Sequence, residues 1–83
     1  METRIVLIGI IVNDRSEIGR LNALLSEYQD YIIGRMGLPH HMYKDKEISI
    51  ISIAMEAPTD KISALSGKIG RLDGISSKVV YAG

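Results

Sequence analysis

The sequence predicts an α+β domain with the ferredoxin-like order βαββαβ, in which one four-stranded antiparallel sheet carries both helices on one face. Three observations lead to this prediction. Residues 4–12 and 47–56 are isoleucine-rich runs with the length and branching of buried strands. Each run is followed by a segment with the 3.6-residue periodicity of an amphipathic helix. A weaker strand pattern follows the first helix, and another follows the second helix after a glycine turn.

The composition limits the classes of protein to which this chain can belong. Its 83 residues contain no repeat, linker or low-complexity tract, so we expect one domain over residues 1–83. There is no cysteine, which excludes disulfides and thiolate-bound metal. Ten basic and ten acidic side chains cancel, so we expect neither direct nucleic-acid binding nor a membrane partner. The apolar run of residues 5–12 is far shorter than the roughly 20 residues that span a bilayer, and we expect a cytoplasmic protein.

The first strand and the first helix are expected within residues 4–28. Residues 4–12 are typical of a central strand, in which Gly9 indicates a bulge or the close approach of another backbone. Asp14 is placed to cap the helix, and Glu17 completes the spacing of a capping box. The apolar stripe of this helix consists of Ile18, Leu21, Leu24, Leu25 and Tyr28.

The next strand is expected over residues 31–38, at an edge of the sheet. Gly34 and Gly37 weaken its packing, and Pro39 is expected to end it because proline cannot donate a hydrogen bond to a neighbouring strand. Residues 40–46 are polar and predict a hairpin connection that is longer than a two-residue turn.

The second half repeats the strand and helix pattern. Residues 47–56 predict the other central strand, and Thr59 is the expected N-cap of the second helix. Gly74 is expected to supply the positive φ of the turn after this helix. Residues 75–82 predict the last strand, at the second edge. The core stripe of the second helix consists of Ile62, Leu65, Ile69 and Leu72.

Both faces of the two central strands are apolar, although two helices can cover only one of them. We therefore expect self-association, as a homodimer or a homotetramer, with the uncovered face between copies. Strand alternation does not say which face is covered, so the candidates come from both. The candidate interface residues are Ile5, Leu7, Ile8, Ile10, Ile11, Ile48, Ile50, Ile51 and Ile53.

Two groups of residues are candidate sites for a small-molecule effector or a partner protein. Asn13, Asp14 and Arg15 follow the first strand, where backbone N–H groups can face a small anion. The alternative for these residues is a helix cap beside a surface arginine. A second group forms a small-residue face on the second helix, which would let either a ligand or the other helix approach closely. It consists of Ser63, Ser66, Gly67 and Gly70.

His40 and His41 are the candidate metal ligands, and a solvated loop is the alternative. Adjacent residues of an extended chain point in opposite directions, so one ion would need ligands from a second copy. No Ser/His/Asp set and no carboxylate pair can be argued from the sequence. We therefore expect no enzymatic activity and no cofactor.

Three segments carry a family resemblance that covers essentially the whole chain. They are V-x-D-R at residues 12–15, R-M-G-L-P at residues 35–39, and I-S-A-L-S-G-K-I-G followed by G-I-S-x-K within residues 62–78. On these segments the chain resembles the regulators of the iron-only hydrogenase system. The resemblance implies an ACT-like fold, similar to the C-terminal domain of nickel-responsive repressors, and a regulatory function.

The sequence and the resemblance together predict a self-associating regulatory module that binds a small ligand or a partner protein. We expect no DNA-binding segment of its own in this module. The alternative is a metal-sensing or metal-handling protein that uses His40 and His41.

Overall fold

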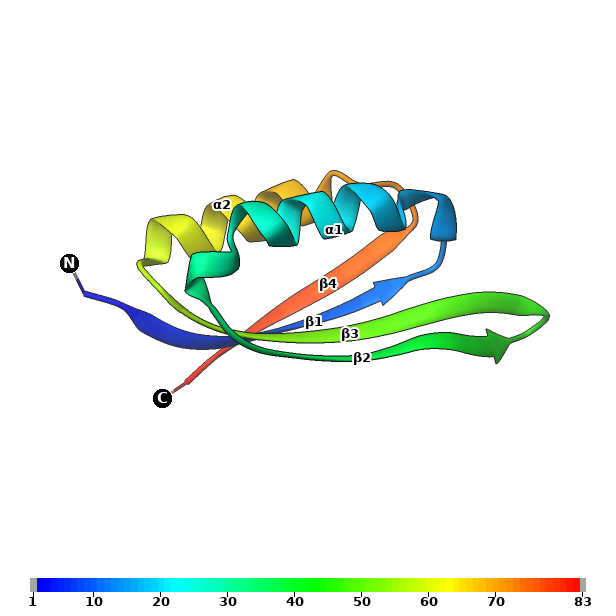
Figure 1. The fold of residues 1–83 in the computed structure, drawn as a ribbon, viewed down its shortest axis with the longest axis horizontal. Coiled ribbons are helices and arrows are strands. Elements are labelled where there is room, and N and C mark those ends of the chain that lie inside the picture. Colours follow the sequence, from blue (N-terminus) through cyan, green and yellow to red (C-terminus); the bar gives the residue numbers. More distant parts are fainter. Residues whose placement is uncertain (1, 83) are drawn as a thin grey trace.

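A single four-stranded sheet lies beneath a layer of two helices in the computed structural model, which describes residues 2–82 (Figure 1). All neighbouring strands are antiparallel, in the order β2-β3-β1-β4. The predicted ferredoxin-like topology is confirmed, with the first and third strands at the centre. The elements are β1 (Arg4–Val12), α1 (Ile18–Glu27), β2 (Ile32–Tyr43), β3 (Lys46–Ala57), α2 (Thr59–Gly70) and β4 (Ile75–Tyr81), with short 3₁₀ turns at Arg15–Glu17 and Gln29–Tyr31. None of the helices in residues 2–82 is long and apolar enough to cross a membrane.

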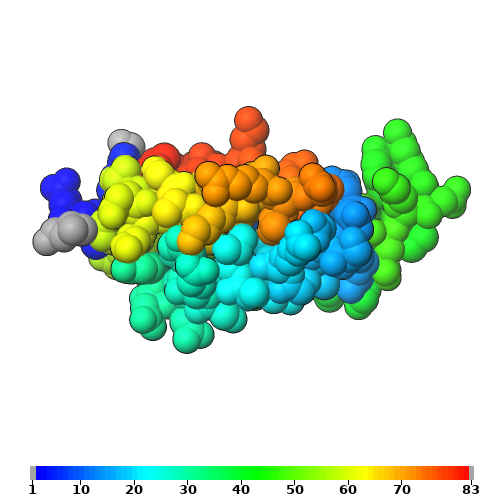
Figure 2. Space-filling model, turned by 90° about the horizontal axis from the view of Figure 1, so that it is seen from above, coloured from blue at the N-terminus to red at the C-terminus, as the bar shows by residue number. Residues whose placement is uncertain are grey.

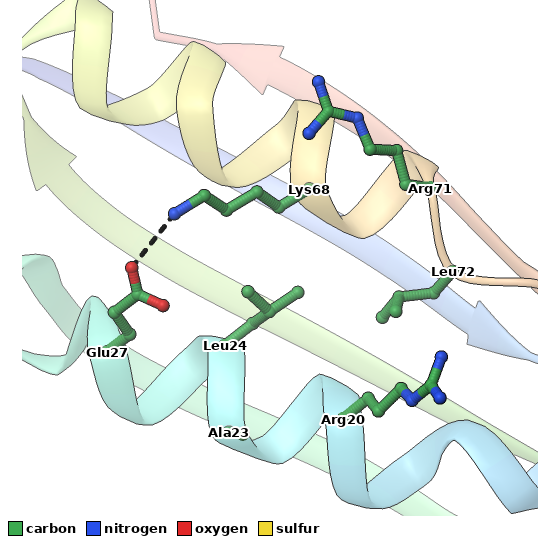
Figure 3. Close-up of a pocket in the computed structure, with 7 residues that line it drawn as sticks. All are labelled: Arg20, Ala23, Leu24, Glu27, Lys68, Arg71 and Leu72. Carbon is green, nitrogen blue, oxygen red and sulfur yellow. Dashed lines mark hydrogen bonds and ion pairs between the residues drawn. The ribbon is translucent and has the colours of Figure 1, made fainter.

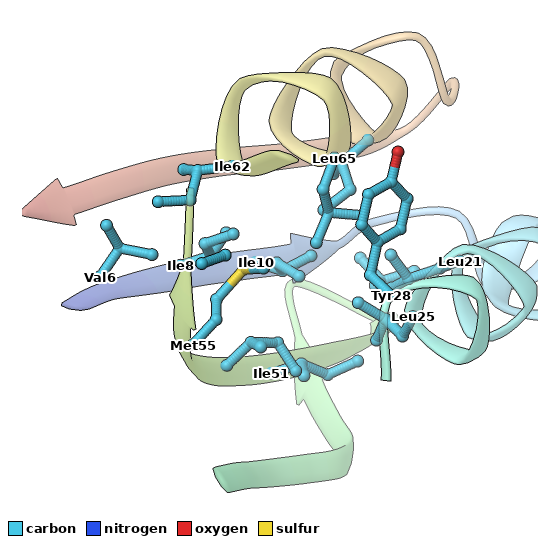
Figure 4. Close-up of a cluster of buried hydrophobic side chains, with 14 residues drawn as sticks. Val6, Ile8, Ile10, Leu21, Leu25, Tyr28, Ile51, Met55, Ile62 and Leu65 are labelled. Atoms are coloured by element: carbon cyan, nitrogen blue, oxygen red, sulfur yellow. The ribbon is translucent and has the colours of Figure 1, made fainter. Parts of the chain in front are cut away.

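The core lies between the helices and the even-numbered face of β1 (Figure 4). Side chains of a strand alternate between its two faces, so every second residue of β1 points toward the helices. Ile8 and Ile53 lie opposite each other in the β1–β3 register, and both are fully buried. Each such side chain contributes about 1.5–3 kcal/mol through the apolar surface that it removes from water. The helices contribute Leu21, Leu25, Tyr28, Ile62, Leu65 and Ile69 to the same cluster.

This burial corrects part of the predicted interface. Five of the nine candidate residues are buried within the protomer, so the expectation that they face another copy is wrong. Ile8, Ile10, Ile51 and Ile53 lie in the core beneath the helices, and Ile48 is buried although strand alternation places it on the other face. The remaining four are exposed, namely Ile5, Leu7, Ile11 and Ile50.

The β2–β3 hairpin is longer, and its turn tighter, than the sequence predicted. Strand β2 continues past Pro39 to Tyr43, and only Lys44 and Asp45 form the turn. Both turn residues have positive φ, 50° and 64°, as in the two-residue turns that match strand twist. Pro39 is accommodated because β2 is an edge strand and its register shifts between Leu38 and His41. The hairpin consequently projects beyond the helices (Figures 1 and 2).

Asp14 is an N-cap as predicted: its Oδ1 accepts the Ser16 N–H at 3.0 Å, at the 3₁₀ turn that leads directly into α1. The capping box is not completed, because the Asp14 N–H donates to the Gly74 oxygen. Two other local predictions were wrong. Helix α2 begins at Thr59 with Pro58 in the N-cap position, so the Thr59 side chain caps nothing. The register of β1 runs unbroken through Gly9, and a Cβ built there meets no atom within 4 Å. Gly9 therefore marks neither a bulge nor a close approach within the protomer.

Candidate functional site

The face of the sheet opposite the helices is left uncovered by the described part of the chain. It combines the odd-numbered residues of β1 with the even-numbered residues of β3, since the register pairs Ile11 with Ile50 and Leu7 with Ala54. The large apolar side chains on it are 37–75% exposed: Ile5, Leu7, Ile11, Met36, Leu38, Ile50 and Val80. We call this surface the open face.

The open face has two apolar bands, and the row between them has two small residues at its centre. One band crosses the sheet from Leu38 through Ile50 to Ile11, and the other is centred on Leu7 and Val80. The row between them consists of Met36, Ser52, Gly9 and Lys78. A hollow in the surface lies beside Gly9, because this residue has no side chain to fill it.

A pocket of about 310 Å³ lies on the opposite side of the sheet, between the start of the helical layer and the β2–β3 hairpin. It contains two arginines, Arg15 and Arg35, together with the polar side chains of Asn22 and Ser49. The remaining lining is apolar and consists of Ile18, Gly37, Pro39 and Ile51. We call it the two-arginine pocket.

Arg35 brings a positive charge to this pocket without a nearby negative one. Its Nη2 donates to Oδ1 of Asn22 at 3.0 Å, which leaves the NH2 half of that amide able to donate elsewhere. Within residues 2–82, no carboxylate oxygen lies within 4.0 Å of the Arg35 guanidinium. The pocket therefore presents donors that have no acidic partner.

Arg15 is held differently, because it ties the hairpin to the turn after β1. Its Nη1 donates to the carbonyl oxygen of Pro39 at 3.0 Å and lies 3.3 Å from Oε1 of Glu47. Nδ1 of His40 lies 2.6 Å from the same Nη1 and 2.9 Å from Oε2 of Glu47. Since Nδ1 either accepts or donates, it can bond only one of these two neighbours at a time. Glu47 already compensates much of the Arg15 charge.

The predicted anion site at Asn13 and Asp14 is wrong. The backbone N–H groups of both residues donate to the carbonyl oxygen of Gly74, at 2.7 and 3.2 Å. The Asp14 carboxylate accepts hydrogen bonds from both the backbone N–H and the Oγ of Ser16, so these two donors are already engaged. These hydrogen bonds lower the pKa of Asp14, that from the Ser16 side chain most strongly. Of the three predicted residues only Arg15 lines the two-arginine pocket.

The small-residue face of α2 does not take part in helix packing. Ser63, Gly67 and Gly70 are exposed, and a Cβ built on either glycine meets no atom within 4 Å. Ser66 is half-buried at the border of the same face. Helical spacing puts this face well away from Lys68, which points toward α1 (Figure 3).

The groove between the two helices is formed by other residues (Figure 3). Leu24 and Leu72 lie between the helices, and Lys68 of α2 reaches Oε2 of Glu27 of α1 at 3.0 Å. Hydrogen bonds to the side chains of Tyr28 and then Glu27 raise the pKa of Lys68. Lys68 thus contributes to holding the two helices side by side.

His40 and His41 lie in strand β2 rather than in a loop. His40 is in contact with Arg15 and Glu47, and His41 is the next residue along the strand, where side chains alternate. Among residues 2–82, no three side chains of His, Cys, Asp or Glu are grouped so that they could hold a metal ion. The structure thus gives the metal hypothesis no ligand set within one protomer.

Sequence reasoning missed Arg35, Asn22 and Ser49. The sequence pattern around them was weakly informative. Arg35 and Gly37 are two residues apart on an edge strand, which shows only that one side of that strand is polar and open. Nothing local connects this strand to Arg15, which precedes Arg35 by twenty residues. The pocket forms only when the hairpin folds back against the start of α1.

The topology and the single helical layer define a ferredoxin-like α+β domain. A solved structure titled "Structure of CPII bound to ADP, AMP and acetate, from Thiomonas intermedia K12" shares this fold at a TM-score of 0.58 and 14% identity, covering 100% of this chain and 93% of that one. Residues 4–79 match the TM1266-like family model, described as "Iron-only hydrogenase system regulator, putative". The chain belongs to this family.

A second solved structure supports the assignment in detail. The uncharacterized protein TM1266 from Thermotoga maritima superimposes with a TM-score of 0.87 at 32% identity, over 99% of this chain and 100% of that chain. The comparison with curated proteins gave no match.

Proposed function

We propose that this protein is a regulatory module that acts as an oligomer, in which copies associate through the open face. The family description supports the regulatory role, and the exposed apolar bands of the open face carry the proposal of self-association. Apolar side chains that are contiguous on a sheet gain free energy when another surface removes them from water.

The size of the open face suits an interface between copies. Strands spaced about 4.8 Å apart make a four-stranded sheet ~19 Å wide, and the nine residues of β1 extend over about 31 Å. The projected area of about 600 Å², before side-chain relief is counted, approaches the ~800 Å² that each partner contributes to a standard interface.

The charge of the open face favours a second copy over nucleic acid or a membrane surface. Its sheet positions include two lysines, Lys46 and Lys78, and one glutamate, Glu56, so the excess of positive charge is a single unit. Phosphate backbones and anionic lipids are bound by clustered basic residues, which this face does not provide. A copy of the same apolar face, with its few charges, is a chemically matched partner.

Within this function we propose no chemical step. The two-arginine pocket holds donors and apolar walls, and Glu47, the acid paired with Arg15, also contacts His40. This arrangement suits binding better than general acid–base catalysis, which needs a titratable group placed at a reacting atom.

The test measures mass in solution by light scattering, with circular dichroism as the check on folding. We expect the wild type to exceed the 9.1 kDa of one chain at about 100 μM, a concentration that populates interfaces of micromolar affinity. The double variant Leu7→Lys/Ile11→Lys, on the open face, should give a folded monomer. Ile8→Lys/Ile10→Lys should unfold, because an unpaired ammonium cannot be buried in the core.

Ser63→Lys/Gly67→Lys is the matched control, since it adds the same two charges to the exposed flank of α2. It should leave the mass of the wild-type oligomer unchanged. A wild type that remains a monomer at this concentration would refute the proposal, and so would an oligomer that survives both charges on the open face.

A further inference from the structure

We propose that the two-arginine pocket is a binding site for a small aliphatic monocarboxylate. The carboxylate would lie against Arg35 and the NH2 group of Asn22, and the aliphatic part against the isoleucine and proline walls. This site lies on the helix side of the sheet, because Arg35 is paired with Ile53 and Gly37 with Ile51, both of which point into the core. The proposal therefore does not depend on association through the open face.

The preference for an anion comes from the charges that line the pocket. The planar fork of a guanidinium matches the two oxygens of a carboxylate, and such charge-assisted pairs are the strongest hydrogen bonds in proteins. Arg35 has no acidic partner within residues 2–82, whereas Arg15 is paired with Glu47 at 3.3 Å. Arg15, Arg35 and Glu47 together carry one net positive charge, which a single carboxylate neutralises.

The preference for a small aliphatic body comes from the walls. Ile18, Pro39 and Ile51 supply apolar surface, and Gly37 keeps the space between them open. A volume of about 310 Å³ lies at the lower end of the range of ligand pockets, about 300–1,000 Å³. The Ser49 hydroxyl, which is buried, donates to the carbonyl oxygen of Pro39 at 2.6 Å, so it offers the ligand no further donor.

The test is a titration of the full chain with 3-methylbutanoate, followed by the amide signals in ¹⁵N-edited NMR spectra. We expect saturable shifts at Asn22, Gly37 and Ser49. The neutral isostere 3-methylbutanamide and inorganic phosphate should each bind more weakly, because one lacks the charge and the other lacks the aliphatic part. Arg35→Gln should weaken binding of 3-methylbutanoate about 10- to 100-fold, the loss expected for a charge-assisted bond. Arg20→Gln, on the exposed side of α1, is the matched control and should change nothing.

A second variant tests the pocket by shape rather than charge. A Cβ at position 37 would meet the Ile50 oxygen at 3.6 Å and Cγ1 of Ile51 at 3.9 Å, which are ordinary contacts. Gly37→Val should therefore fold, narrow the pocket beside Ile51 and weaken the shifts. The proposal is overturned if 3-methylbutanoate causes no saturable shifts up to about 50 mM, far above a millimolar dissociation constant. It is equally overturned if the amide or phosphate binds as well as the carboxylate, or if Arg35→Gln or Gly37→Val binds like the wild type.

Discussion

The carbonyl oxygen of Gly74 accepts the N–H of Asp14 at 3.2 Å, and a Cβ on Gly74 would lie 2.5 Å from the Cβ of Asp14. The turn that contains Asp14 follows β1, and the turn that contains Gly74 precedes β4. These two strands are neighbours in the sheet, and β4 is an edge strand. Only a residue without a side chain lets the backbones approach this closely. Gly74 also has a φ of 71°, in the region that favours glycine. One residue thus satisfies a turn and a long-range contact together.

Gly74→Ala should destabilise the fold by at least about 1–3 kcal/mol, because it adds both backbone strain and a clash with Asp14. Gly67→Ala is the matched control. Its site is an exposed helix position with nothing within 4 Å of the new Cβ, so it should stabilise by about 0.5–1 kcal/mol. Urea unfolding measures both. Equal free energies of unfolding for the two variants would contradict the role given to Gly74.

Ile53→Ala should lower the free energy of unfolding by about 2–5 kcal/mol, because Ile53 is fully buried between β1 and the helices and its truncation leaves a cavity. Ile33→Ala removes the same atoms from a side chain that is 61% exposed, and should cost less than about 1 kcal/mol. Chemical denaturation of both variants is the measurement. A small effect at Ile53 would show that β3 does not present this face to the core.

The double variant Lys44→Asn/Asp45→Gly should stabilise the β2–β3 hairpin by roughly 1 kcal/mol. Both turn residues have positive φ, and Asn-Gly is the pair that adopts this turn with least strain. Thermal unfolding of the full chain reports the change. Lys46→Asn, in the first residue of β3, should bring no gain. A double variant less stable than the wild type would contradict the two-residue turn.

Stability should decrease in acid partly through Asp14. Its pKa is lowered in the folded state by the Ser16 hydrogen bonds, so its contribution is fully present above the ordinary aspartate pKa of about 4. It is lost as the pH falls from there through the lower folded pKa. Urea midpoints between about pH 6 and pH 3 should therefore fall less steeply for Asp14→Asn than for the wild type.

Ser16→Ala is the companion variant for this experiment, because it removes the Oγ donor and keeps the backbone N–H donor. Its dependence on pH should lie between those of the wild type and Asp14→Asn. Parallel curves for the wild type and Asp14→Asn would show that these hydrogen bonds do not couple to folding.

The sequence by itself determined which segments become strands and helices, and their order. These are local properties: the β-branched run of residues 4–12 favours an extended chain, and the 3.6-residue spacing of Ile62, Leu65 and Ile69 favours a helix. Gly74 could be predicted for the same reason, because positive φ after a helix is a local requirement. The start of the second helix was predicted less well, because Pro58 rather than Thr59 takes the N-cap position.

The tertiary structure alone decided which face of the sheet is buried and where a ligand could bind. Because both faces of β1 are apolar, its alternation fits either choice, and only the positions of the helices bury Ile8 while leaving Leu7 exposed. The length of β2 was decided by pairing with β3, which outweighed the polar composition of residues 40–43. Arg15 and Arg35 lie on different elements and meet only when the hairpin packs against α1. Contacts between residues far apart in the chain depend on the whole fold, so no local pattern reports them.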